Sequence, residues 1–515
     1  MLILPMLLAF APSPGITDTI DKHIVADWQA RSVTPAAEVD DAGFLRRVSL
    51  DVLGRSPKVS EARAFLADAD PRKREKVVEK LLSMAGHAQH FANTTRMEWM
   101  PQTGIDPGNF FAGQTVERWL QERFKLNTPA DEVVRRLLTA PVELRLGSRS
   151  ASIPNNADSA ALVGFYDAND VKPELLGSVA SRLFLGVKLE CAQCHDHPFA
   201  PIRRPQFWQF AAFFGEFAAL PPVPPSFVGP LTPQYDRNRI TIPGTETTVA
   251  ATYFDGSEPE WTHLRSPRQE LARWLTDGAN PYFARNAVNR MWARFFGLGL
   301  VDPIDEPGDA NPPSHPELLD ELAKLFVQSG YDNRALIRGI VASKAYQRSS
   351  KLSHPTQGDA RRFARMLPRS LSGLQIYNSF RIATGEEDIR PDSYQVNPGG
   401  LRGQFVQQFP TANRPTESQT SILQALLLMN GTAMANATSV KNSWTLAAVI
   451  DAPFMDTNQK VDALFLAALA RMPTDEEREK HASYIDRGGP SGDKPKALAD
   501  VFWVLLNSTG FLLNH

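Results

Sequence analysis

This sequence has little net charge, few cysteines and no long apolar run after its first residues. Its 55 lysines and arginines against 57 aspartates and glutamates leave a formal net charge of −2, so there is no electrostatic basis for binding nucleic acid. No later stretch approaches about 18 uninterrupted apolar residues, so we expect no transmembrane span. Only two cysteines are present, which excludes a zinc site built from two cysteine pairs.

The two cysteines that the chain does have lie in one short motif, Cys191-Ala192-Gln193-Cys194-His195. Chance would place two cysteines three apart with a histidine next in only about one in ten thousand such chains. CxxCH is the spacing in which two thiols add to the vinyl groups of one haem and the following imidazole binds the iron. The motif therefore predicts haem c attached to Cys191 and Cys194, with His195 as the proximal iron ligand.

Two other interpretations of the motif stay open. Cys191, Cys194 and one or both of His195 and His197 are possible ligands of a zinc or iron ion, although zinc sites usually take their second ligand pair from further along the chain. The cysteines are also compatible with a local disulfide or a reduced thiol pair. On a helix His197 would point away from His195, so with a haem we expect it not to bind the iron but to orient a neighbouring residue or to hydrogen-bond a propionate.

A sixth ligand to a haem iron would have to come from elsewhere in the chain. His87 and His90 are three residues apart and can share a helix face, and Met97 and Met100 follow closely. We take His90, Met97 and Met100 as candidate distal ligands.

Three further residues of the second half are candidates for a site. Arg290 and Arg294 are one helical turn apart and can clamp an anion, or can pair with nearby carboxylates. Those carboxylates are Asp302, Asp305 and Asp309. His315 lies in the first turn of a predicted helix, where Ser314 and Glu317 have the spacing of a capping box.

The first residues resemble a secretory signal. Met1–Ala11 is mostly apolar, and Ala9-Phe10-Ala11 fits a cleavage site of small residues, so we expect residues 1–14 to be a signal peptide. This predicts a periplasmic, secreted or cell-surface protein. Export agrees with CxxCH, because covalent haem attachment of this type takes place outside the cytoplasm.

Helical spacing of apolar residues, punctuated by glycine and proline, predicts a mainly α fold in both halves. We expect a cytochrome-c-like helical domain over 15–220, a Pro-rich and partly β-prone connector over 221–260, and a second helical domain over 261–515. Within the connector, Arg239–Ile242 and Thr247–Val249 predict a small hairpin.

A weak internal repeat joins the two ends of the chain. The apolar helix predicted at Leu45–Leu53 is followed by Arg55-Ser56-Pro57, and the one at Val461–Leu469 is followed by Arg471-Met472-Pro473. In both copies a second helix begins after the proline, and Thr474 and Glu477 form a predicted capping box in the later copy.

Five stretches give the sequence a resemblance to a known family: FLRRVSLDVLGRSP, CAQCHDHPF, NRMWARFFGLGLV, PPSHPELLDELA and LLNSTGFLLNH. It resembles the planctomycete-type family in which domain of unknown function 1549, described as cytochrome-c-like (PSCyt type), precedes domain 1553 (PSD type). The resemblance implies haem binding and electron transfer, which we carry over only to Cys191, Cys194 and His195.

We therefore predict an extracytoplasmic protein that carries one haem c and passes single electrons to a redox partner that the sequence does not identify. One alternative is a metal-dependent extracytoplasmic enzyme, for example one acting on complex carbohydrate, that uses the cysteine–histidine cluster with Arg290 and His315. Another is a non-catalytic surface or scaffold protein with a structural disulfide. The sequence leaves open whether the protein is an enzyme and what its oligomeric state is.

Overall fold

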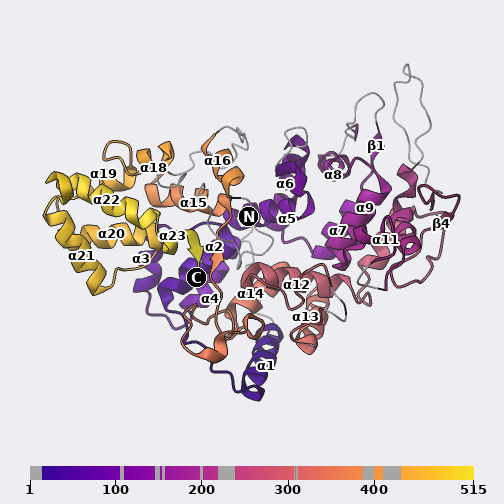
Figure 1. The fold of residues 1–515 in the computed structure, drawn as a ribbon, viewed down its shortest axis with the longest axis horizontal. Coiled ribbons are helices and arrows are strands. Elements are labelled where there is room, and N and C mark those ends of the chain that lie inside the picture. The colour runs from indigo at the N-terminus through magenta and orange to yellow at the C-terminus, as the bar shows by residue number, and fades with distance from the viewer. Residues whose placement is uncertain are drawn as a thin grey trace, which may run out of the picture. The chain divides into compact units, whose positions relative to one another are not determined.

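The computed structural model describes residues 14–104, 110–144, 151–152, 157–197, 201–218, 238–306, 308, 311–386, 400–409 and 431–515. These residues are mainly helical, as predicted, and their strands form two-stranded sheets (Figure 1). No helix in them is long and apolar enough to cross a membrane. The predicted signal peptide lies outside the described residues except for Pro14.

The chain forms two compact units, and each is assembled from separate stretches of sequence. Unit 1 contains the described residues up to His23, Phe91–Arg294 and Leu298–Ile340. Unit 2 contains Ile24–His90, Phe295–Gly297 and Val341–His515. The domains that we predict from the sequence are continuous stretches with boundaries near 220 and 260, and these boundaries stay a prediction.

Helices α1 (Pro14–Ala30), α5 (Ala85–Trp99), α12 (Phe283–Phe296) and α14 (Asn333–Ala342) contribute residues to both units. The remaining helices of unit 1 are η1 (Pro101–Gly104), α6 (Phe110–Lys125), α7 (Ala130–Leu138), α8 (Ala157–Asp167), α9 (Pro173–Ala180), η3 (Ser181–Leu185), η4 (Leu189–Ala192), α10 (Arg204–Ala211), η5 (Ala212–Phe217), α11 (Pro267–Leu275) and α13 (Pro316–Gln328). Its strands are β1 (Glu143–Leu144), β2 (Ala151–Ser152), β3 (Arg239–Thr241) and β4 (Thr248–Ala250).

Aromatic side chains fill the core of unit 1 around α10 and η5. The buried ones are Phe207, Trp208, Phe210, Phe213, Phe214 and Phe217. Strands β3 and β4 pair antiparallel as the predicted hairpin, and the chain that follows them brings Tyr253 onto Phe213, with ring centroids 5.2 Å apart. Trp274 of α11 also stacks on Tyr253, with ring centroids 4.7 Å apart. Part of the predicted connector is therefore packed into this aromatic core.

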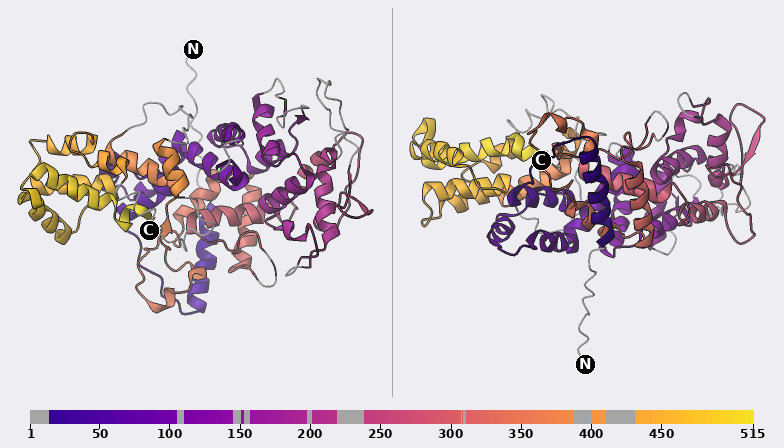
Figure 2. Two further views of the ribbon diagram at one scale, coloured as in Figure 1. Left: turned by 45° about the horizontal axis from the view of Figure 1, so that its top comes forward. Right: turned by 90° about the horizontal axis from the view of Figure 1, so that it is seen from below.

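Unit 2 is also helical. Its helices are α2 (Asp41–Leu53), α3 (Val59–Ala67), α4 (Lys73–Ser83), η6 (Pro355–Gln357), η7 (Ala360–Arg362), α15 (Gly373–Thr384), α16 (Leu401–Gln408), α18 (Thr432–Ala437), α19 (Trp444–Ile450), α20 (Thr457–Leu469), α21 (Asp475–Asp486), η8 (Gly489–Ser491), α22 (Lys494–Leu506) and α23 (Thr509–Leu512). Strand β5 (Arg369–Ser370) pairs antiparallel with β6 (Leu513–Asn514). Helices α20, α21 and α22 lie side by side (yellow in Figure 2) and bury apolar residues such as Leu464 and Phe502 between them.

The internal repeat is present in the structure as the same joint between two helices. Gly54 (φ 66°, ψ 26°) follows the end of α2, and Ala470 (φ 58°, ψ 23°) follows the end of α20. In both copies the chain therefore leaves the helix through a residue in the left-handed conformation. Pro57 and Pro473 then follow at the same spacing. A residue with φ above zero ends a helix by redirecting the backbone.

A bidentate ion pair closes each copy of the joint. Arg55 donates to both carboxylate oxygens of Glu61 at 2.8 and 2.9 Å. Arg471 donates to both oxygens of Glu477 at 2.7 Å. The predicted capping box of the later copy is confirmed, because the Glu477 amide donates to the Thr474 hydroxyl at 3.2 Å and the Thr474 amide donates to the Glu477 carboxylate at 2.8 Å.

Candidate functional site

The CxxCH motif begins in η4 and continues as a turn of helical conformation in unit 1. The amide of Gln193 donates to the carbonyl of Glu190 at 3.2 Å, and Gln193 has φ −64° and ψ −41°. Residues three apart lie on the same side of such a turn. Cys191 and Cys194 therefore lie on one side of it, and both are free thiols, the first half-buried and the second exposed.

The ring of His195 is exposed and has a defined hydrogen-bond partner. Its Nδ1 lies 2.7 Å from the backbone carbonyl oxygen of Asp196. A carbonyl oxygen can only accept, so Nδ1 carries a proton, and in the neutral ring Nε2 then has the free lone pair. Metal-binding histidines typically have one ring nitrogen donating in this way while the other binds the metal.

Helix α10 holds the motif from one side. Trp208 donates its indole N–H to the carbonyl of Gln193 at 3.0 Å, and Arg204 donates its Nε to the same oxygen at 3.3 Å. The backbone N–H of Arg204 donates to the carboxylate of Asp196 at 2.8 Å. The peptide between the two cysteines and the residue after His195 are thus both fixed to one helix.

Sequence reasoning did not identify Asp196 and Arg204 as part of the site. It offered Trp208 only as one of several aromatic residues that would form either a porphyrin pocket or plain core, and it did not predict the contact of Trp208 with the motif. Asp196 stands within the motif stretch itself, and a carboxylate beside a ligand histidine is a signal that could have been used. The contacts of Arg204 and Trp208 join them to residues that lie between 8 and 15 positions earlier in the sequence. No local pattern in the sequence indicates such contacts.

His197 follows the motif and is hydrogen-bonded to a residue further along the chain. Its backbone N–H donates to the carbonyl of Ile202 at 2.8 Å, and its side chain is half-buried. Among the described residues, no group of three or more His, Cys, Asp or Glu side chains is placed to bind a metal ion. The zinc or iron alternative at Cys191 and Cys194 would therefore need ligands in a different arrangement from the one found.

The candidate distal ligands fall in different units. Met97 and Met100 belong to unit 1 with the motif, Met97 half-buried and Met100 fully buried. His87 and His90 belong to unit 2, where the His90 ring packs so closely on Gly54 that a Cβ there would lie 2.3 Å from Nδ1. Their roles as iron ligands stay predictions.

Arg290 and Arg294 of α12 are each paired with a carboxylate. Arg290 contacts Asp305, as predicted, and donates to the carbonyl of Arg182 at 2.6 Å. Arg294 pairs with Glu98 at 2.9 Å, a partner that the sequence did not indicate. Burial raises the pKa of Asp305 above its usual range even though Arg290 lies beside it. Asp309 lies outside the described residues.

Asp305 also ties this cluster to the chain that enters the motif. Its backbone carbonyl accepts from the amide of Lys188 at 2.9 Å, three residues before Cys191. Both sides of the CxxCH segment are therefore anchored, by Asp305 before it and by α10 after it. Arg290 therefore contacts Asp305, the residue that holds the chain just before the motif.

His315 is buried and lies at the first turn of α13, as predicted, but the predicted capping box is wrong. The cap position belongs to His315 itself, no side chain makes a capping hydrogen bond there, and Pro316 is the first helical residue. The Ser314 hydroxyl lies 3.0 Å from Nδ1 of His315. Ser314 is one residue too early to reach the amides that a capping side chain binds.

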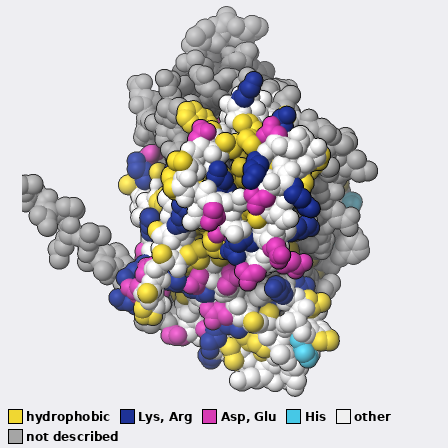
Figure 3. All heavy atoms as spheres, turned by 90° about the vertical axis from the view of Figure 1, so that its left-hand side faces the viewer, with side chains coloured by type: hydrophobic (Ala, Val, Ile, Leu, Met, Phe, Trp, Pro, Cys, Tyr) yellow, Lys and Arg dark blue, Asp and Glu magenta, His cyan; other side chains and the backbone are white. Residues whose placement is uncertain are grey.

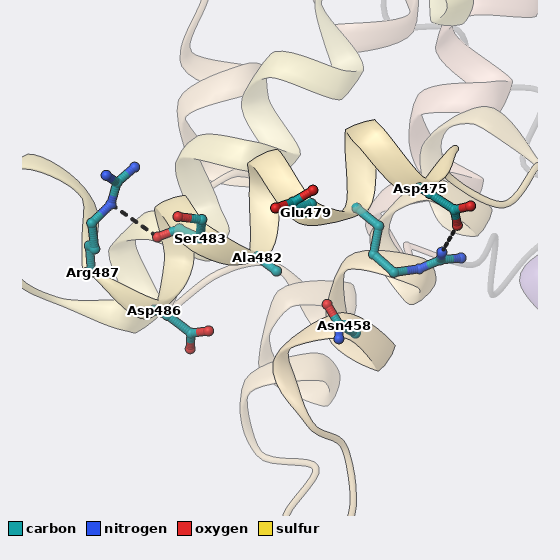
Figure 4. A pocket seen from close by; sticks show the side chains of 8 residues that line it. Asn458, Asp475, Glu479, Ala482, Ser483, Asp486 and Arg487 are labelled. Carbon is teal, nitrogen blue, oxygen red and sulfur yellow. Dashed lines mark hydrogen bonds and ion pairs between the residues drawn. The ribbon is translucent and has the colours of Figure 1, made fainter.

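A groove of about 540 Å³ lies on a different part of the molecule, along α21 in unit 2 (Figure 4). It contains none of the predicted site residues. Arg478 in its wall pairs with Asp462 and Asp475, both at 2.9 Å, and Arg487 donates to the Ser483 carbonyl at 3.2 Å. On the face of the molecule drawn in Figure 3, acidic and basic side chains are interspersed. The groove therefore indicates no ligand class.

The protein is thus a mainly helical chain of two compact units, and its CxxCH motif lies on a turn of helical conformation in unit 1. Residues 19–219 match the family described as protein of unknown function DUF1549 (PSCyt2), and residues 267–408 match that described as protein of unknown function DUF1553 (PSD1). The chain belongs to the planctomycete-type family that combines these two domains in this order. Neither a curated protein nor a solved structure matches it.

Proposed function

We propose that this protein carries one haem c on Cys191, Cys194 and His195 and transfers single electrons outside the cytoplasm. The observation that carries the proposal is the state of His195, whose Nδ1 is held by a backbone carbonyl at 2.7 Å beside two free thiols. Nε2 is then the atom available to bind iron.

The residues present fit a covalently attached haem. Each thiol would add across one vinyl group, so that the sulfur forms a bond to carbon and the thiol proton goes to the neighbouring carbon. Cys191 and Cys194 lie on one side of a turn, which lets both reach a single porphyrin. When bound, the haem would supply an iron that is reversibly reduced by one electron.

Exposure of the motif also favours this function. Cys194 and His195 are exposed, so a maturation enzyme could reach them and a redox partner could approach a haem attached there. Export, predicted from the apolar run Met1–Ala11, would bring the chain to the compartment where such attachment occurs.

The test is to express the chain with its leader in a host that has a cytochrome-maturation system and to measure covalent haem on a denaturing gel. We expect about one haem per chain, still attached after acid-acetone extraction. Cys191→Ser and Cys194→Ser should each leave at most one link, and His195→Ala should change the spin state of the iron or prevent maturation.

The matched control is His354→Ala, because His354 is also exposed and its Nδ1 is also hydrogen-bonded, at 2.8 Å from the Thr356 hydroxyl. It should leave haem content unchanged. Wild-type protein with no Soret band under these conditions, holding stoichiometric zinc or a Cys191–Cys194 disulfide instead, would contradict the proposal.

A further inference from the structure

We infer that Asp196 and Trp208 are positioning residues that hold the CxxCH motif in its ligand-ready form before any haem is attached. The inference rests on the proposed function for its consequences at the iron. Its structural content, that α10 shapes the motif, is independent of haem. Neither residue would touch the iron itself.

Trp208 acts on the peptide between the two cysteines. Its side chain is 2% exposed, and its only polar atom donates to the Gln193 carbonyl at 3.0 Å. A buried indole N–H needs a partner, and Phe207 packs edge-to-face against the same ring at 5.2 Å. The ring is therefore fixed in the core, and the Gln193 peptide is fixed to the ring.

Asp196 acts on the orientation of His195. Its carbonyl accepts from His195 Nδ1 at 2.7 Å, and its carboxylate accepts from the backbone N–H of Arg204 at 2.8 Å. Arg204 is the first residue of α10, so the carboxylate also meets the positive end of that helix. Rotation of the Asp196 peptide would turn the His195 ring and would break the contact with α10.

Helix α10 is itself well fixed, which is what makes it a template. At Gly177 of α9 a Cβ would lie 3.0 Å from Cα of Ala211, so the two helices pack in close contact. Arg204 also donates to the carbonyl of Pro243 at 2.8 Å, beyond strand β3. The conformation of the motif follows from the fold of unit 1 and does not require the cofactor.

The first experiment measures amide hydrogen exchange in haem-free protein. Gln193 and His197 donate their amides to Glu190 and Ile202, so they report on the motif. Trp208→Phe keeps an aromatic ring in the core but removes the five-membered ring with its N–H, and we expect about five- to tenfold faster exchange at those two amides. Trp119→Phe is the control, because Trp119 is 4% exposed in α6 and its indole N–H has no hydrogen-bond partner among the described residues.

Equal exchange at Gln193 and His197 in the two variants would overturn the role of Trp208. Because this measurement uses haem-free protein, it decides the point even if wild-type chain proves not to bind haem. Thermal unfolding of both variants shows whether the change is confined to the motif. We expect similar losses of global stability in the two, since each removes the same ring area.

The second experiment uses haem-loaded protein and the exposed Asp196, whose replacement does not disturb the core. Asp196→Ala should shift the reduction potential and change the absorption bands that report the proximal ligand, because the His195 ring is less restrained. Asp196→Asn keeps an oxygen that can accept from Arg204 and should restore the wild-type spectrum. Wild-type spectra and potential in Asp196→Ala, or no recovery in Asp196→Asn, would overturn the role of Asp196.

Discussion

At the scale of single residues, the two copies of the helix joint differ at the left-handed position. Gly54 and Ala470 have nearly the same backbone angles, with φ of 66° and 58°. A non-glycine residue pays about 1–2 kcal/mol for this conformation. The surroundings differ, because a Cβ at Gly54 would lie 2.3 Å from the ring of His90, whereas Ala470 is already buried with its methyl group in place.

We expect exchanging these two residues to have unequal effects. Gly54→Ala should lower the free energy of unfolding by about 2–4 kcal/mol, because strain adds to the collision with His90. Ala470→Gly should stay within about 1 kcal/mol of wild type, because relief of strain offsets the loss of a buried methyl group. Urea denaturation measures both, and a large loss in Ala470→Gly would contradict this account.

The site illustrates what residue patterns can and cannot predict. The spacing of Cys191, Cys194 and His195 identified the candidate ligands because those residues are adjacent in sequence. The contacts of Trp208 and the pairing of Arg294 with Glu98 were not predicted, since each joins residues that only the fold brings together. A pattern within one turn of helix carries no information on such partners.

Glu477 gives the joint a dependence on pH. Its hydrogen bonds from Arg471 outweigh partial desolvation and lower its pKa from 4.5 to about 2. A carboxyl whose pKa is lower in the folded state contributes stability above its usual pKa and loses that contribution as the pH falls through the folded value. The window for this residue therefore lies between 4.5 and about 2.

We expect the difference in free energy of unfolding between wild type and Glu477→Gln to be constant near neutral pH and to shrink as the pH falls from 4.5 towards 2. Urea denaturation at a series of pH values measures it. Glu476→Gln removes an exposed carboxylate from the same turn and controls for the lost charge. A difference that stayed constant down to about pH 2 would show that Arg471 does not stabilise the ionised carboxyl.

At the scale of elements, the same ion pair closes two joints that differ in burial. The side chains of Arg55 and Glu61 are 14% and 19% exposed, whereas those of Arg471 and Glu477 are 36% and 34% exposed. Removing one member of a buried pair leaves a charge without compensation, and this costs more than at an exposed site. The stability of the earlier joint should therefore depend more on its ion pair, Arg55 with Glu61.

We expect Arg55→Leu to lower the free energy of unfolding by about 2–3 kcal/mol and Arg471→Leu by no more than about 1 kcal/mol. Replacing the glutamate in the same chain should cost little more in either copy, because the pair is already broken. Chemical denaturation of the single and double variants gives the coupling energies. Equal costs in the two copies would mean that burial does not set the strength of the ion pair.

Most elements were predictable from sequence because helical spacing and caps are local. The hairpin of β3 and β4 and the Thr474–Glu477 box are confirmed on that basis. The capping box predicted for Ser314 and Glu317 is wrong. Pro316 begins the helix, so the cap position falls on His315 and not on Ser314. Sequence spacing locates a cap only to within about a residue or two.

At the scale of the whole molecule, the arrangement of the chain could not be read from residue order. In unit 2, Asp51 of α2 accepts hydrogen bonds from three distant residues: Tyr346 at 2.7 Å, Asn514 at 2.8 Å and Arg369 at 2.9 Å. Burial, and the charge of Asp51, raise the pKa of Tyr346 well above its usual range, so the phenol stays a donor. All three partners follow residue 260 in the sequence.

Two buried arginines of the same helix, α2, also make contacts with residues from the second half of the chain. Arg46 donates to the carbonyls of Gly510 and Phe511 at 2.8 and 2.9 Å, and Arg47 contacts the carbonyl of Tyr346. Burial lowers the pKa of both guanidinium groups to about 10, which reflects how far they are removed from water. Without residues beyond 260, Asp51, Arg46 and Arg47 would lose these partners, although Arg46 would keep its hydrogen bond to the Ser56 hydroxyl at 2.8 Å.

We therefore expect a chain that ends at residue 260 not to fold cooperatively. Removing the partner of a single buried charge costs about 3–5 kcal/mol, and several such losses together exceed the stability of an ordinary domain. The fragment should keep helical far-UV circular dichroism but lose the near-UV signal and the cooperative urea transition. Mixed with residues 261–515, it should recover both signals, because each unit takes residues from the two fragments. A fragment that alone showed a cooperative transition and a near-UV spectrum would mean that the first half of the chain builds its own core and that the contacts of Asp51 are dispensable.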